Sequence, residues 1–192
     1  MSRHRGSSIQ FGKRREMIGY SVYLYYAAHG VLILLLLLAA AFDVWKLILP
    51  NMVAILVAAA FCAVAILLPP GQISWLSHLG AGAAVFAVGL LVFRFSFLGA
   101  GDIKLLTAIA LWAGFDQLLI LLVCIGLAGG ALAVAVLLMR NLLRSLVLYV
   151  PMSGSLAAAQ LVCERTKLPY GLAIALGSIW VIYDLPPPGF LY

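Results

Sequence analysis

Long stretches without a formal charge are the feature that most constrains what this chain can fold into. Between Lys46 and Arg94 lie 47 consecutive residues, 47–93, with no Asp, Glu, Lys or Arg. Residues 17–42 and 117–139 add further uncharged runs of 26 and 23 residues. Because about 20 apolar residues are enough for a helix to cross a bilayer, these runs predict membrane-spanning helices.

The composition agrees with this reading and excludes a water-soluble protein. Of the 192 residues, 66% are hydrophobic and 9% are charged, and the mean hydropathy is +1.16, whereas a soluble domain carries about 25% charged residues. The net charge of +6 does not indicate a nucleic-acid partner, because the basic residues form no continuous stripe. Scattered cations are instead typical of the ends of membrane helices. We therefore expect an all-α polytopic membrane protein whose surroundings are the lipid bilayer.

The sequence predicts about six transmembrane helices in one membrane-embedded domain, residues 17–192. The segment Pro69-Pro70-Gly71 divides the longest uncharged run into two spans. The expected spans are 20–42, 51–69, 74–95, 103–115, 117–139 and 168–184. Residues 140–167 are ambiguous, because 145–163 is uncharged and long enough for a seventh span. Cations at both of its ends favour a cytoplasmic or interfacial linker instead.

The basic residues also predict the orientation of the chain in the membrane. The linkers after the first, third and fifth spans carry seven cations, whereas the other linkers and the tail carry none: Lys46, Arg94, Lys104, Arg140, Arg144, Arg165 and Lys167. This asymmetry places the odd-numbered linkers in the cytoplasm. The basic N-terminal arm, residues 1–16, would then be exported. We favour a translation start at Met17, and the alternative is that a short leading arm escapes the rule.

Two of the six acidic residues stand out. Glu16 and Glu164 lie in polar stretches, and Asp116 and Asp184 fit a turn and a helix end. Asp43 and Asp102 instead lie at or just within the predicted cytoplasmic membrane edge, where an ionised carboxylate is costly and a function is the default hypothesis. The alternative is that each aspartate forms an ion pair with the lysine that follows it, Asp43 with Lys46 and Asp102 with Lys104.

Glycines next to Asp102 favour the functional reading. Gly99 and Gly101 precede it, and their lack of side chains would let another backbone approach closely. An intramembrane hydrolase needs such an approach, because its substrate must lie in extended form against the catalytic acid. The three cysteines form no CxxC pair, and no cluster of His, Cys and Asp is apparent, so the sequence predicts no metal site and no cofactor.

Four segments resemble the type IV prepilin peptidase family, whose members are GxGD intramembrane aspartic proteases. Gly99-Ala100-Gly101-Asp102-Ile103-Lys104-Leu105-Leu106, continuing to Leu111-Trp112-Ala113-Gly114, is similar to the signature that gives these proteases their name. Upstream, the segment from Asp43 through Lys46 and Leu49 to Pro50-Asn51 resembles the family's D-x5-[IL]-P-N motif. The segments 127–130 and 168–175 resemble recurrent family segments.

This resemblance implies an aspartic endopeptidase of the bacterial inner membrane. It would remove a short basic leader from prepilins or prepilin-like proteins at the cytoplasmic face, just before their apolar helix, for pilus assembly or secretion. Asp43 and Asp102 match the two catalytic aspartates, Lys46 and Lys104 would support them, and Pro50-Asn51 would start the second span. Without paired cysteines for a tetracysteine domain, the chain resembles the small branch typical of tight-adherence (Flp) pilus systems, and N-methyltransferase activity is not expected.

Other functions also fit a small membrane protein with buried acids. An archaeal-type preflagellin peptidase or another GxGD protease is the near alternative. A transporter or a catalytically inactive membrane subunit is the more distant one. The inactive subunit predicts that replacing the aspartates leaves function intact.

Overall fold

The computed structural model describes residues 3–46, 49–95, 98–149 and 169–184, and its ordered elements are all helices. In chain order they are α1 (Arg3–Lys46), α2 (Asn51–Leu67), α3 (Trp75–Arg94), α4 (Ala100–Tyr149) and α6 (Tyr170–Asp184). The absence of strands within these ranges follows from the long apolar runs, because a helix satisfies its backbone hydrogen bonds internally in lipid. The chain is therefore an all-α membrane protein, as the sequence predicts.

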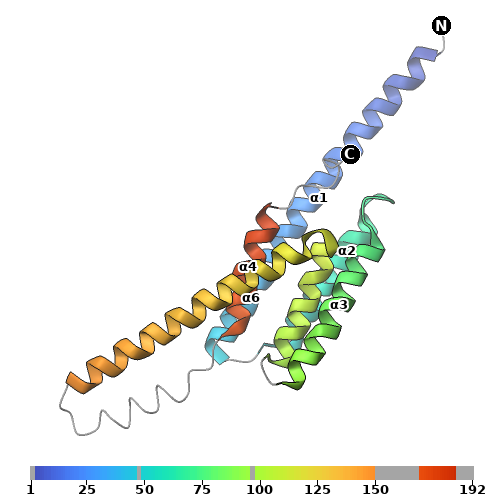
Figure 1. Ribbon diagram of the computed structural model, residues 1–192. Coiled ribbons are helices and arrows are strands. Elements are labelled where there is room, and N and C mark those ends of the chain that lie inside the picture. The colour runs from blue at the N-terminus through green and yellow to red at the C-terminus, as the bar shows by residue number, and fades with distance from the viewer. Residues whose placement is uncertain (1–2, 47–48, 96–97, 150–168, 185–192) are drawn as a thin grey trace.

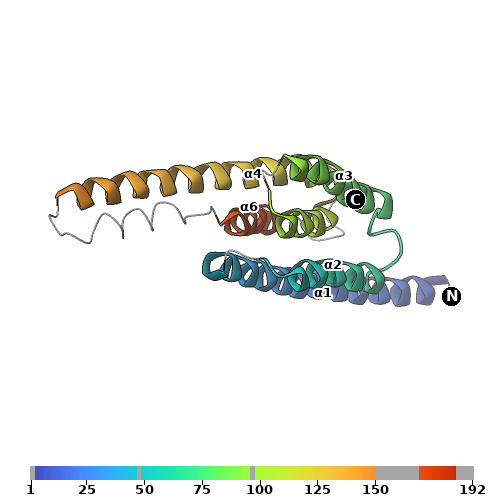
Figure 2. The same ribbon diagram turned by 90° about the horizontal axis from the view of Figure 1, so that it is seen from below.

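The helices form a bundle around α4. Helix α1 packs against α2 and α6, while α4 packs against α2, α3 and α6. The bundle is seen from two directions in Figures 1 and 2, and in both the C-terminal part of α4 extends away from it. The first part of α1 extends away at the opposite end of the bundle. Because α1 begins at Arg3, this part includes most of the basic N-terminal arm.

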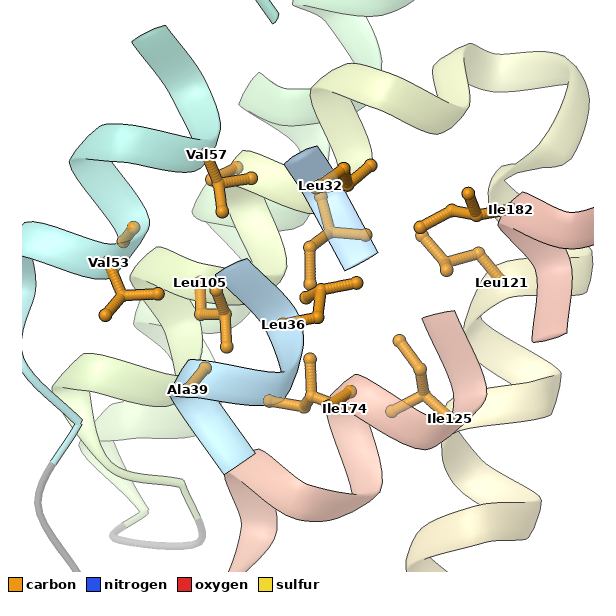
Figure 3. Packing of buried hydrophobic residues seen from close by; sticks show 14 of the residues in the cluster. Leu32, Leu36, Ala39, Val53, Val57, Leu105, Leu121, Ile125, Ile174 and Ile182 are labelled. Atoms are coloured by element: carbon orange, nitrogen blue, oxygen red, sulfur yellow. The ribbon is translucent and has the colours of Figure 1, made fainter. Parts of the chain in front are cut away.

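The apolar core lies where α1, α2, α4 and α6 meet. Buried side chains recur every three or four residues along each helix, which puts them on one face. Figure 3 shows them pointing toward one another, among them Leu32, Leu36, Val57, Leu105 and Ile174. Helix α3 contacts α4 through glycines instead: Gly82 faces Leu111 and Gly89 faces Ile103. The core holds the ends of α1, α4 and α6 in fixed positions relative to one another.

Each of the six predicted spans overlaps a helix, and the helices differ in length. Within the described residues, three stretches are long and apolar enough to cross a membrane: Val22–Lys46, Trp75–Arg94 and Ala100–Leu142. Helices α2 and α6 are apolar but shorter, 17 and 15 residues. The stretch Ala100–Leu142 contains two predicted spans, and the break between them is at Gly114 rather than beside Asp116.

The break in α4 has a backbone cause. Gly114 has φ 63° and ψ 179°, a combination that essentially only glycine adopts. Side chains of α3 form hydrogen bonds with backbone groups on both sides of this break. The ring N–H of His78 donates to the Leu111 carbonyl at 2.7 Å, and the Phe115 amide donates to the Ser77 hydroxyl at 3.0 Å. Both contacts satisfy groups that a broken helix leaves without partners.

Helix α4 continues past the residue at which the sequence predicts the fifth span to end. The prediction ends that span at residue 139 and begins a linker at 140, whereas α4 continues to Tyr149. No glycine or proline interrupts the chain between Gly130 and Pro151, so nothing in the sequence stops the helix earlier. The rest of the predicted linker, residues 150–167, lies outside the described residues.

Candidate active site

Asp43 is the most buried acidic side chain in the described part of the chain. It lies in the last turn of α1, and only 6% of its surface is exposed. Its Oδ2 accepts a hydrogen bond of 2.6 Å from the backbone amide of Gly171, in the first turn of α6. The free N–H groups of a helix N-terminus are favourable partners for a carboxylate. Asp43 therefore links the end of α1 to the start of α6.

Asp102 lies in the first turn of α4 and is partly buried. Its Oδ2 accepts a hydrogen bond of 3.2 Å from the amide of Gly99, three residues earlier, while the Ile103 amide donates to the Gly99 carbonyl. This arrangement resembles half of a capping box, in which an acid in the first turn bonds back to the start of its own helix. The Asp102 carboxylate is thereby held at the α4 N-terminus.

The two carboxyl groups come together at one end of the bundle. Asp43 and Asp102 are close enough for their charges to interact, although 58 residues separate them in the sequence. Leu49 connects the two helix ends, because it lies against Gly101 in the first turn of α4 and against Gly171, whose amide bonds Asp43. Two carboxyl groups that share a site hold one proton between them more readily than they both ionise, which provides an acid and a base in one place.

Leu49 lies between the segments that carry these acids. A Cβ atom added at Gly101 would lie 3.0 Å from Leu49 Cβ and 3.1 Å from its carbonyl oxygen, and one at Gly171 would collide with Leu49 Cδ1. The close approach that Gly101 permits in this structure is therefore to the backbone of Leu49. Gly99 faces the Asp102 carboxylate instead.

The two lysines do not pair with the aspartates in the described part of the chain. Lys104 donates a hydrogen bond of 3.0 Å to the Asn51 side chain, and the Lys46 ammonium lies 5.8 Å from the centre of the Phe42 ring. The alternative in which each aspartate is neutralised by the following lysine is therefore wrong for this arrangement. For Lys104 the reason is helical geometry, because residues two positions apart on a helix do not face each other.

Pro50 and Asn51 lie where the second span begins. Pro50 precedes α2 with extended backbone, φ −64° and ψ 133°, and its carbonyl accepts from the Val53 amide at 3.1 Å. Asn51 is the first residue of α2. Through its bond to Lys104, Asn51 joins the start of α2 to the start of α4.

A groove of about 370 Å³ lies between α2, α3 and α4. From α4 it is lined by Lys104, Thr107, Ala108 and Leu111, which lie on the opposite side of the helix from Asp102 at 100° per residue. The groove is therefore separate from the carboxyl pair. Among the described residues, no three His, Cys, Asp or Glu side chains gather in a way that could hold a metal ion.

Sequence reasoning overlooked Gly171 and Leu49 as parts of this site. Both lie in segments already recognised as motifs, 168–175 and 43–51, but neither position carries a reactive side chain. Gly171 contributes a backbone amide and an absence of bulk, and Leu49 contributes packing. Only their spatial neighbours reveal either role.

Comparison with known proteins agrees with the motif reading. Residues 30–134, more than half of the chain, match the type IV leader peptidase family, and this region includes Asp43, Leu49 and Asp102. No curated protein and no solved structure gives a significant match. The bundle of apolar helices with two carboxyl groups at one end is consistent with the family match. The chain therefore belongs to the type IV leader peptidase family, which is a family of peptidases.

Proposed function

We propose that this protein is an aspartic endopeptidase that uses Asp43 and Asp102 to remove a short basic leader from prepilins or prepilin-like proteins. The observation that carries the proposal is that these two carboxyl groups lie at the same end of the bundle, in the last turn of α1 and the first turn of α4, near enough for their charges to interact. Nothing else in the described residues combines two acids with restricted solvent access. The family match supports peptide hydrolysis as the reaction.

The mechanism follows from one proton shared by two carboxyl groups. The ionised member takes a proton from a water molecule as that water attacks the scissile carbonyl carbon. The protonated member donates its proton to the carbonyl oxygen, and a tetrahedral intermediate forms. Proton transfer to the leaving nitrogen then breaks the C–N bond. The backbone amides of Gly171 and Gly99 hold the two carboxylates in place during these transfers.

The proposed reaction side is the cytoplasmic face. The seven cations of the odd-numbered linkers favour that side for the ends of α1 and α3 and the start of α4. A substrate with a basic leader and a following apolar helix obeys the same rule, so its leader would lie on the same side as the acids. We propose a role in pilus assembly or secretion, in the small tight-adherence branch of the family, with hydrolysis alone and no methylation.

The test uses single replacements of carboxylates by amides. Asp43→Asn and Asp102→Asn are each co-expressed with a panel of tagged type IV prepilins, and processing is followed by gel shift. We expect each variant to lose at least about 100-fold in cleavage rate, since general acid or base catalysis contributes about 10²–10⁴-fold. Asp116→Asn is the matched control, because Asp116 is exposed and lies at the other end of the first half of α4.

Three outcomes would contradict the proposal. Retained cleavage in either aspartate variant would show that the carboxyl pair does not carry out the reaction. Equal loss in Asp116→Asn would show that removing any carboxylate disturbs folding. An inactive family member would instead leave every prepilin of the panel uncut by the wild-type protein.

A further inference from the structure

Helix α6 lies outside residues 30–134, the region that matches the family, yet its first turn contacts Asp43. We propose that Gly171 is a positioning residue for Asp43: its amide orients the carboxylate, and its missing side chain makes room for it. This inference rests on the proposed peptidase function, because positioning affects the rate only if Asp43 takes part in the reaction.

The contact between Gly171 and Asp43 is short and sheltered from solvent. The amide hydrogen bond to Asp43 Oδ2 measures 2.6 Å, and both residues are buried. Because Gly171 N–H is in the first turn of α6, no intrahelical carbonyl is available to it. The bond therefore satisfies the amide and fixes one oxygen of Asp43, which leaves the other oxygen for chemistry.

No larger residue fits at position 171 without a displacement. A Cβ atom there would lie 2.9 Å from Asp43 Oδ2 and 3.0 Å from Asp43 Cγ, and it would collide with Leu49 Cδ1. Helix α6 cannot easily retreat to relieve this crowding. Gly177 packs against the backbone of Ile125 in α4, and Ile174 and Ser178 are fully buried. The displacement would therefore fall on Asp43 and Leu49.

The experiment measures Gly171→Ala with the full-length protein in bacterial membranes, against the prepilin panel. We expect kcat per folded molecule to fall about 100-fold with little change in KM, since displacing a reacting group by about 1 Å can cost that factor. Gly177→Ala is the matched control on the same helix. Its added methyl group would lie 2.6 Å from Ile125 Cα, away from Asp43, so it should lower the folded fraction but keep kcat per folded molecule.

A second variant separates crowding by Leu49 from loss of the Asp43 geometry. Leu49→Ala removes the collision between a Cβ atom at position 171 and Leu49 Cδ1, but it leaves the close contact of that Cβ atom with the Asp43 carboxylate. Adding Gly171→Ala to Leu49→Ala should therefore lower the cleavage rate by the same factor as adding Gly171→Ala to the wild-type protein. Recovery of the rate in the double variant would overturn the proposal, and so would equal kcat values for Gly171→Ala and Gly177→Ala.

A spectroscopic measurement keeps this inference testable apart from the proposed function. The infrared difference spectrum between each protein and its Asp43→Asn counterpart isolates the Asp43 carboxyl band, whose frequency responds to hydrogen bonding. We expect the band to move in Gly171→Ala and to stay in place in Gly177→Ala. If the wild-type protein cuts no prepilin but the band moves, the contact stands and the proposed function fails. An unmoved band in Gly171→Ala contradicts the positioning role whatever the activity.

Discussion

Leu49 is the residue at which three segments of the candidate site meet. Its backbone lies against Gly101 of α4, and its side chain lies against Gly171 of α6. It follows Asp43 by six positions and directly precedes Pro50 at the start of α2. A leucine at this position therefore spaces the two acid-bearing helix ends, and the glycines opposite it set how closely they approach.

At the residue scale, we predict that Gly101→Ala destabilises the protein. The added Cβ would lie 3.0 Å from Leu49 Cβ and 3.1 Å from its carbonyl oxygen, and overpacking of this kind costs about 1–3 kcal/mol. The free energy of unfolding in detergent, measured by denaturant titration, should fall by that amount, and prepilin cleavage should fall with it. Gly130→Ala is the control, since nothing lies within 4 Å of a Cβ atom there. Equal stability of the two variants would contradict this reading of Gly101.

At the element scale, α4 consists of two helical halves joined at the backbone break at Gly114. The break determines which helices each half contacts. The first half carries Asp102 and packs against α2 and α3, and the second half carries Leu121 and Ile125, which pack against α6. His78 and Ser77 of α3 bond the two helix ends at the break. Trp112 adds a hydrogen bond of 3.0 Å to the Val57 carbonyl of α2. The end of the bundle far from the acids is thus joined by polar contacts between α2, α3 and α4.

We predict that Gly114→Ala weakens this junction. A Cβ-bearing residue at φ 63° and ψ 179° is strained by about 1–3 kcal/mol, and its methyl group would also lie 3.2 Å from the His78 ring and the Ser77 hydroxyl. The unfolding free energy should fall by about that amount in the same detergent titration. Gly126→Ala tests the same exchange elsewhere in α4, in open space, and should leave stability unchanged or raise it by up to about 1 kcal/mol. A Gly114→Ala protein as stable as Gly126→Ala would mean that the helix tolerates other geometries at this point.

At the scale of the whole molecule, function depends on which side of the membrane the carboxyl pair faces. The chain between α2 and α3 lies at the opposite end of the bundle from the acids, whereas the chain following α3 leads directly to Gly99 and Asp102. The cation count favours the cytoplasm for the second of these connections. This orientation is the one that the proposed cleavage at the cytoplasmic face requires.

We predict opposite labelling for cysteines placed at these two ends. In a protein whose three native cysteines are replaced, Gln72→Cys should react with a membrane-impermeant maleimide on intact cells. Phe95→Cys should react only after permeabilisation. Both native side chains are exposed, so access to the reagent depends on the side of the membrane. The reverse pattern would place the acids outside and would contradict cleavage at the cytoplasmic face.

Much of this molecule could be predicted from its sequence, because scarce charge leaves few alternatives. Uncharged runs of about 20 residues or more predict membrane-spanning helices. Asp43 and Asp102 are recognisable as acids next to such runs. Only the tertiary structure reveals which residues these side chains and glycines contact. Asp43 bonds to an amide 128 residues away, Lys104 bonds to Asn51 rather than to an acid, and Gly101 makes room for Leu49. Local patterns determine which residues form helices and which are costly to bury. Which helix ends meet depends on packing between distant segments, and no local pattern records that.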